Sequence, residues 1–111
     1  MRNVKPEVVA ALLRALPRVF FSSPDDDADL PCISYLELNN TPSGGADDEE
    51  YTSAVEIAVD IWGENSPEEI SAIALDVDRE MMAIGFVRTS APDIPPEEGT
   101  YHKNITYERM D

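Results

Sequence analysis

The segment 52–62, TSAVEIAVDIW, alternates apolar and polar side chains, and this pattern constrains the fold of the 111-residue chain more than any other. The apolar positions are Val55, Ile57, Val59 and Ile61, and the opposite face carries Thr52, Glu56 and Asp60. Because successive side chains of a strand point to opposite faces of a sheet, this period of two predicts a strand with one buried face. The rest of the chain has to supply its partner strands and a covering layer.

Two segments have the spacing of amphipathic helices. The first runs from Pro6 to Leu16 and ends before Pro17, which cannot continue a helix. Its apolar stripe is Val8, Val9, Leu12, Leu13 and Leu16. The second begins at a capping sequence, in which Ser66 precedes a first-turn proline and an acid follows three residues later. Its predicted inward stripe is Ile70, Ile73, Ala74, Val77 and Met81, and Gly85 stands where a helix stops.

Three further segments have strand character, namely 31–40, 85–90 and 101–110. Segment 22–29, SSPDDDAD, has the serine, proline and aspartate content of a loop. Segments 41–50 and 91–100 are rich in proline and acids, which predicts an acidic hairpin loop and a further loop. The expected fold is therefore one α+β domain over 1–111, with the order α-β-β-α-β-β. It consists of an antiparallel four-stranded sheet with two helices packed on one face.

The charge of the chain is its strongest compositional feature. It has 23 acids against 8 bases and a net charge of −15, with no Lys or Arg between Arg18 and Arg79. Such a surface repels phosphate backbones and anionic lipid head groups, so nucleic acid and membrane are disfavoured as direct partners. Three interpretations stay open: a solvated acidic surface, a channel wall past which DNA slides, or a surface that imitates DNA.

No pattern in the sequence indicates catalysis. The chain lacks a phosphate-binding glycine loop, a dinucleotide-binding motif, a zinc-ligand spacing and a nucleophile elbow. Its one histidine, His102, lies among threonines on a predicted strand and is interpreted as a surface residue. The carboxylates of Asp47, Asp48, Glu49 and Glu50 could hold a hard cation, but a run of acids in a loop is usually solvated. We expect no enzyme activity, no metal and no cofactor.

Four segments together resemble phage tail terminator or tail completion proteins, the small acidic neck proteins of long-tailed phages. They are VEIAVDIWGENSPEEI (55–70), AIALDVDREMMAIGF (72–86), VRTS (87–90) and DIPPEEGTYHKNITYER (93–109). The order of the expected elements is similar too, from an opening helix to a strand that ends at Asp60 and Trp62. The resemblance covers nearly the whole chain, but its pattern lies at the level of the fold, so other phage neck and head-completion proteins are alternatives.

The resemblance implies a structural virion protein with a place in the neck of the particle, assembled in the host cytoplasm. Such proteins form a hexameric ring of identical subunits at the head-proximal end of the tail tube, end tube growth, and offer a surface to the head connector or stopper protein. By analogy, the loop that carries Asp47, Asp48, Glu49 and Glu50 would face a partner or the lumen. DNA would pass through that negative lumen without specific binding.

The resemblance also gives a possible role to four bases in the second half of the chain. Pairing with acids of a neighbouring subunit would assign them to the ring interface, whereas pairing within the same chain would only neutralise local charge. They are Arg79, Arg88, Lys103 and Arg109. A different class of function, an acidic DNA-mimic inhibitor, would use the same net charge to occupy a nucleic-acid-binding cleft.

Overall fold

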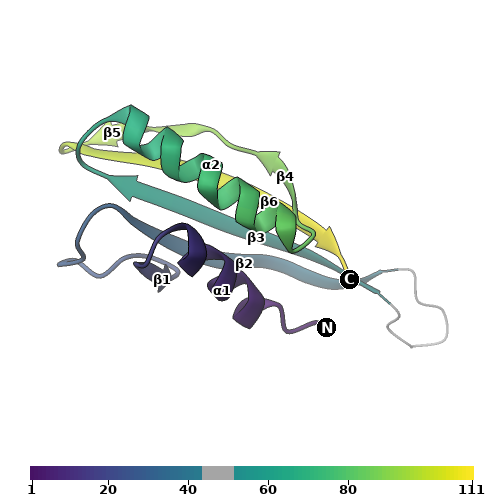
Figure 1. Cartoon of the computed structure of the whole chain (residues 1–111). Coiled ribbons are helices and arrows are strands. Elements are labelled where there is room, and N and C mark those ends of the chain that lie inside the picture. The colour runs from purple at the N-terminus through teal and green to yellow at the C-terminus, as the bar shows by residue number, and fades with distance from the viewer. Residues whose placement is uncertain (44–51) are drawn as a thin grey trace.

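The computed structural model of the chain describes residues 1–43 and 52–111, and within them it contains two helices and six strands. Their order is α-β-β-β-α-β-β-β (Figure 1). The elements are α1 Lys5–Ala15, β1 Val19–Phe21, β2 Cys32–Ser43, β3 Thr52–Gly63, α2 Pro67–Ala83, β4 Val87–Ser90, β5 Asp93–Glu97 and β6 Thr100–Met110.

The six strands form one mixed sheet. Neighbouring strands follow the order β1-β2-β3-β6-β4, and β5 also pairs with β6. β1 is parallel to β2, and the other pairs are antiparallel. β2, β3 and β6 are the long central strands in Figure 1, and the short strands lie at the two edges.

The expected antiparallel four-stranded sheet is therefore wrong, because β1 and β5 add two strands and one parallel pair. β1 has only three residues, too few to display an alternating pattern. β5 has the sequence DIPPE and lies inside 91–100, where the prolines favoured a loop. Proline cannot donate a hydrogen bond to a sheet, but an edge strand with one free side tolerates it. All five β5 residues are exposed, as an edge position allows.

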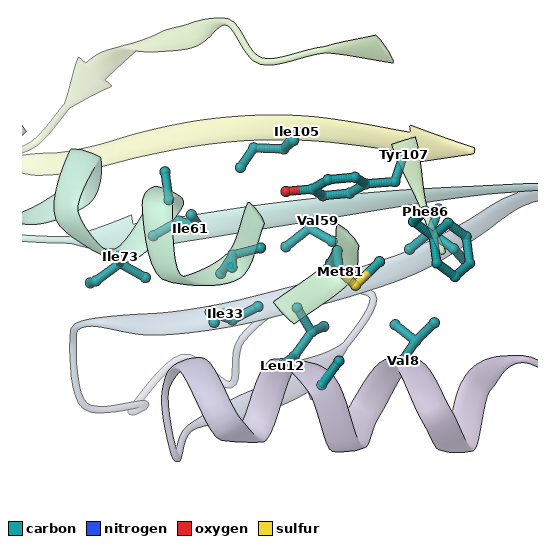
Figure 2. Close-up of a cluster of buried hydrophobic side chains, with 14 of the residues drawn as sticks. Val8, Leu12, Ile33, Val59, Ile61, Ile73, Met81, Phe86, Ile105 and Tyr107 are labelled. Atoms are coloured by element: carbon teal, nitrogen blue, oxygen red, sulfur yellow. The ribbon is translucent and has the colours of Figure 1, made fainter. Parts of the chain in front are cut away.

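Both helices cover the same face of the sheet and pack against each other (Figure 1). β3 directs Val55, Ile57, Val59 and Ile61 into this layer, and all four side chains are buried. Figure 2 shows side chains from α1, α2 and the central strands meeting in one cluster. The opposite face of the sheet, which we call the outer face, carries the alternate residues of β2, β3 and β6.

The buried stripe of α1 differs from the prediction. Val8 and Leu12 are buried as expected, but Ala11 joins them and Leu13 is 47% exposed. The helix is thus rotated toward Ala11, and Val4, just before the first turn, extends the same stripe. Residues four apart and three apart share one side of a helix, so Val4, Val8, Ala11 and Leu12 form a single continuous contact surface.

The ends of α2 follow the predicted chemistry. The hydroxyl of Ser66 accepts a hydrogen bond from the backbone N–H of Glu69 at 3.2 Å. At the other end, Gly85 has a φ of 91°, a conformation that glycine adopts without the penalty of a side chain. The backbone N–H groups of Gly85 and Phe86 then bond to the carbonyls of Met82 and Met81, which is a Schellman motif. The five predicted core residues of α2 are all buried.

Candidate functional site

The four acids Asp47, Asp48, Glu49 and Glu50 lie outside the described residues. The four bases are described, and each contacts an acid of its own chain. Arg79 pairs with Asp76 at 3.0 Å, Arg88 with Asp78 at 3.2 Å, and Lys103 with Asp93 at 3.2 Å, while Arg109 pairs with Glu7 and Asp111. These contacts agree with the local-neutralisation alternative, and a role between subunits stays a prediction.

Arg109 is the most enclosed of these bases, with a side chain only 14% exposed. Its guanidinium also donates to the carbonyl of Ile84 at 2.7 Å and lies 4.6 Å from the centre of the Phe86 ring. The hydrogen bond to Asp111 raises the pKa of Arg109 above its ordinary value, against the opposing effect of burial. Arg109 therefore joins the end of β6 to α1 and to the end of α2.

A cluster of polar and aromatic side chains occupies the outer face near the start of β6. Trp62 and His102 are opposite each other on β3 and β6, and their rings stack with centroids 3.7 Å apart and planes at 14°. His102 Nε2 lies 2.7 Å from Asp60 Oδ1, which also accepts a hydrogen bond from Asn104 Nδ2 at 3.0 Å. We call Trp62 and His102 together the aromatic stack.

The aromatic stack is held in place from the neighbouring strand. Trp62 Nε1 donates to the hydroxyl of Ser34 at 3.1 Å, and Ser34 is fully buried although it lies on the face without helices. His102 was predicted to be a surface residue, but its side chain is 18% exposed and has two partners. The register of β3 with β6 brings Asp60 and Trp62 next to His102, and the sequence alone does not specify this register.

A pocket of about 570 Å³ lies beside the aromatic stack. Trp62 and His102 form part of its wall, and the remainder comes from the loop between β1 and β2, from β5, from the turn after it and from Thr100 at the start of β6. Four carboxylates line it: Asp25, Asp26, Glu97 and Glu98. Among the described residues, none of these four acids makes an ion pair. We call this cavity the acidic pocket.

The acidic pocket combines an aromatic part of its wall with uncompensated negative charge, which suits a cationic group. Within residues 1–43 and 52–111, no group of three or more His, Cys, Asp or Glu side chains is arranged to hold a metal ion. In the same part of the chain, neither helix has the length and apolar character needed to cross a membrane.

Sequence reasoning missed the acidic pocket although it recognised both segments that build it. The segments 22–29 and 91–100 were each predicted as acidic loops, but they are about 70 positions apart in the chain. They meet because the 22–31 connection leads into the start of β2, and the pairings of Cys32 with Trp62, of Trp62 with His102 and of His102 with Ile94 place that start at the same end of the sheet as β5. The aspartates and glutamates were visible signals, whereas their meeting depends on the register of β2, β3 and β6 and on the pairing of β5 with β6, which the sequence does not specify.

The fold is similar to that of a chain in the solved structure described as "Virion of native gene transfer agent (GTA) particle". The TM-score is 0.67, and the match covers 95% of this chain and 88% of that chain. The two chains share a fold. Their sequences are only 11% identical, so the likeness is one of architecture.

No family model matches the sequence, and no curated protein matches it. The likeness to a chain of a virion particle shows the fold alone. Membership of the tail terminator family stays a prediction.

Proposed function

We propose that the protein is a structural component of a phage-type virion that caps the head-proximal end of a tail tube as a ring. In this role it ends tube growth and provides the surface on which the head joins the tail. The observation that carries the proposal is the fold shared over 95% of the chain with a chain of a virion particle. The tail terminator resemblance in residues 55–109 supplies the finer position in the neck.

The proposed partners are other copies of the chain in a hexamer, the tail tube protein and the head connector or stopper protein. DNA crosses the lumen without specific contacts, because a net charge of −15 repels its phosphates. The proposed location is the neck of the virion, and assembly takes place in the host cytoplasm. A structural role of this kind requires no catalytic site.

The edges of the sheet are the proposed contacts between subunits. β1 and β4 lie at opposite edges of the strand order, and each exposes a large apolar side chain. Phe21 on β1 is 56% exposed, and Val87 on β4 is 63% exposed. A contact between one edge and the opposite edge of a neighbour is head-to-tail, and such contacts close into rings when the rotation permits.

Salt is expected to favour the ring. Each subunit carries a charge of −15, and within residues 1–43 and 52–111 five bases pair with acids of the same chain. Few cations are therefore left to bridge subunits, and repulsion between them falls as the Debye length shortens. Native mass spectrometry across an ammonium acetate series, with negative-stain images in parallel, should show six-subunit rings that increase with ionic strength.

Two variants make this experiment specific for the sheet edge. Val87→Asp adds a charge at β4 and should dissociate the ring, whereas Leu75→Asp on α2 adds the same charge at a similarly exposed residue and should leave the ring intact. A monomer at every ionic strength contradicts self-assembly into a ring. Rings that disappear as salt rises contradict the repulsion argument and show that ion pairs hold the interface.

A further inference from the structure

We infer that the acidic pocket receives an arginine side chain presented by another virion protein. The inference rests on the proposed function for the identity of the partner as a virion component, and it adds the chemistry by which that partner is recognised. The pocket volume of about 570 Å³ lies within the range of protein ligand sites, roughly 300–1,000 Å³.

The first argument is the shape and chemistry of the wall. Trp62 and His102 stack with nearly parallel rings, and the contacts to Ser34 and Asp60 fix both rings in position. Aromatic side chains that are already fixed lose little freedom when a ligand packs against them. The guanidinium of arginine is planar and stacks on aromatic faces, whereas the ammonium of lysine is a compact and strongly hydrated charge.

The second argument is charge complementarity. Asp25 and Asp26 come from the loop before β2, and Glu97 and Glu98 come from the end of β5 and the turn after it, so the carboxylates reach the pocket from two separate segments. None of these four acids has an ion-pair partner in the described part of the chain. A guanidinium with five N–H donors can bond to carboxylates while it stacks, because the donors lie in the plane of the group.

The third argument concerns the source of the arginine. Arg14, Arg79, Arg88 and Arg109 already pair with acids of their own chain. Arg18 donates to the carbonyl of Pro31 at 2.9 Å, and Arg2, the remaining arginine, also has a partner. A second copy of this chain would have to break one of these contacts to fill the pocket, whereas a partner with an unpaired arginine would not. We therefore assign the pocket to a different protein.

The test uses the full chain and the tripeptide Ac-Gly-Arg-Gly-NH₂ at 150 mM salt. Trp62 is the only tryptophan, so its indole N–H signal in a ¹H–¹⁵N spectrum reports the pocket wall without ambiguity. We expect this signal to move saturably with the arginine peptide and less with the lysine analogue. The analogue with citrulline, which has nearly the shape of arginine without its charge, should leave the signal in place.

A matched pair of variants separates the pocket from general charge attraction. Asp25→Asn with Asp26→Asn removes two carboxylates of the pocket and should weaken binding by about three- to tenfold, as for two partly exposed ion pairs. Asp27→Asn with Asp29→Asn makes the same charge change in the same loop outside the pocket lining and should weaken it by less than about twofold.

Three outcomes overturn the inference: an unmoved indole signal, an equal response to citrulline, or equal losses in the two double variants. The result is independent of ring formation, because a single subunit contains the whole pocket. If the protein binds the arginine peptide selectively but stays monomeric in native mass spectra, the arginine site is supported and the proposed ring is refuted. Rings without selective binding would refute the arginine site alone.

Discussion

The hydroxyl of Tyr107 gives the sharpest test of the packing between the sheet and α2. Tyr107 is fully buried on the inner face of β6, and its ring lies within the core cluster (Figure 2). Its hydroxyl donates to Asp78 Oδ1 on α2 at 3.1 Å, and Asp78 Oδ2 accepts from Arg88 at 3.2 Å. This chain of contacts connects β6, α2 and β4 through a single carboxylate.

Tyr107→Phe removes the hydroxyl and keeps the ring. A hydrogen bond to a charged group contributes about 1.5–3 kcal/mol to stability. Because Asp78 keeps its contact with Arg88 in the variant, we expect the free energy of unfolding at pH 7 to fall by about 1.5 kcal/mol, the lower end of this range. Tyr101→Phe is the control, because Tyr101 packs against the same core and its hydroxyl makes no hydrogen bond among the described residues. That change should cost less than about 0.5 kcal/mol.

The pH dependence of this difference is a stricter test. Burial, together with the negative charge of Asp78, raises the pKa of Tyr107 well above its ordinary value. The unfolded chain loses the phenol proton above about pH 10, while the folded chain keeps it. The stabilisation by Tyr107 is therefore complete below pH 10 and is lost as the pH rises above it. At pH 11 the loss amounts to about 1.4 kcal/mol.

The assay is urea unfolding followed by circular dichroism, with the wild-type chain and Tyr107→Phe compared at pH 7, 10 and 11. The wild-type advantage should fall from about 1.5 kcal/mol to near zero over this range, because the Phe variant has no phenol to titrate. Effects of the other titrating groups cancel in the difference. If the difference in free energy of unfolding between the two chains stays constant from pH 7 to pH 11, the hydroxyl of Tyr107 is not buried and hydrogen-bonded as described.

Two further substitutions test the charges. Arg109→Gln leaves the carboxylates of Glu7 and Asp111 without their cation and should lower the free energy of unfolding by about 2 kcal/mol or more. Arg79→Gln is the control, because its ion pair is exposed, and it should lower the free energy of unfolding by less than about 0.5 kcal/mol. Equal losses in the two variants would contradict the enclosed network around Arg109. Glu108→Lys should raise the free energy of unfolding by about 0.5 kcal/mol, because it replaces a repulsive pair with Glu56, directly opposite on β3, by an attractive one. An equal rise in Glu64→Lys would show that only the net charge of the chain matters.

The parts of the fold that follow from local chemistry could be predicted from the sequence. The alternation along β3 and the stripe of α2 are confirmed because one buried face determines each pattern. Ser66 and Gly85 are confirmed as the ends of α2 because caps depend on neighbouring backbone groups. β1 and β5 could not be predicted, since both are short edge strands whose pairing depends on β2 and β6.

The candidate site was less predictable, because it depends on residues that are distant in the chain. Trp62 and His102 were each visible, but their stacking follows from the register of β3 with β6. Asp25 and Glu97 were assigned to two separate loops, and the pairing of β2 with β3, of β3 with β6 and of β6 with β5 brings those segments to one pocket. Composition therefore indicated the sign of the charge, and topology determined where that charge gathers.

The central place of β6 has a consequence for how the chain reaches its folded state. β6 pairs with β3 along one edge and with β4 and β5 along the other, and Ala54 of β3 lies opposite Met110. Contacts so distant in sequence form late, because a long loop must close before they are made. Until β6 docks, β3 exposes an unpaired edge rich in β-branched residues, which is a template for aggregation. A charge of −15 then keeps incomplete chains apart, so the acidity that governs the finished surface also protects the protein during folding.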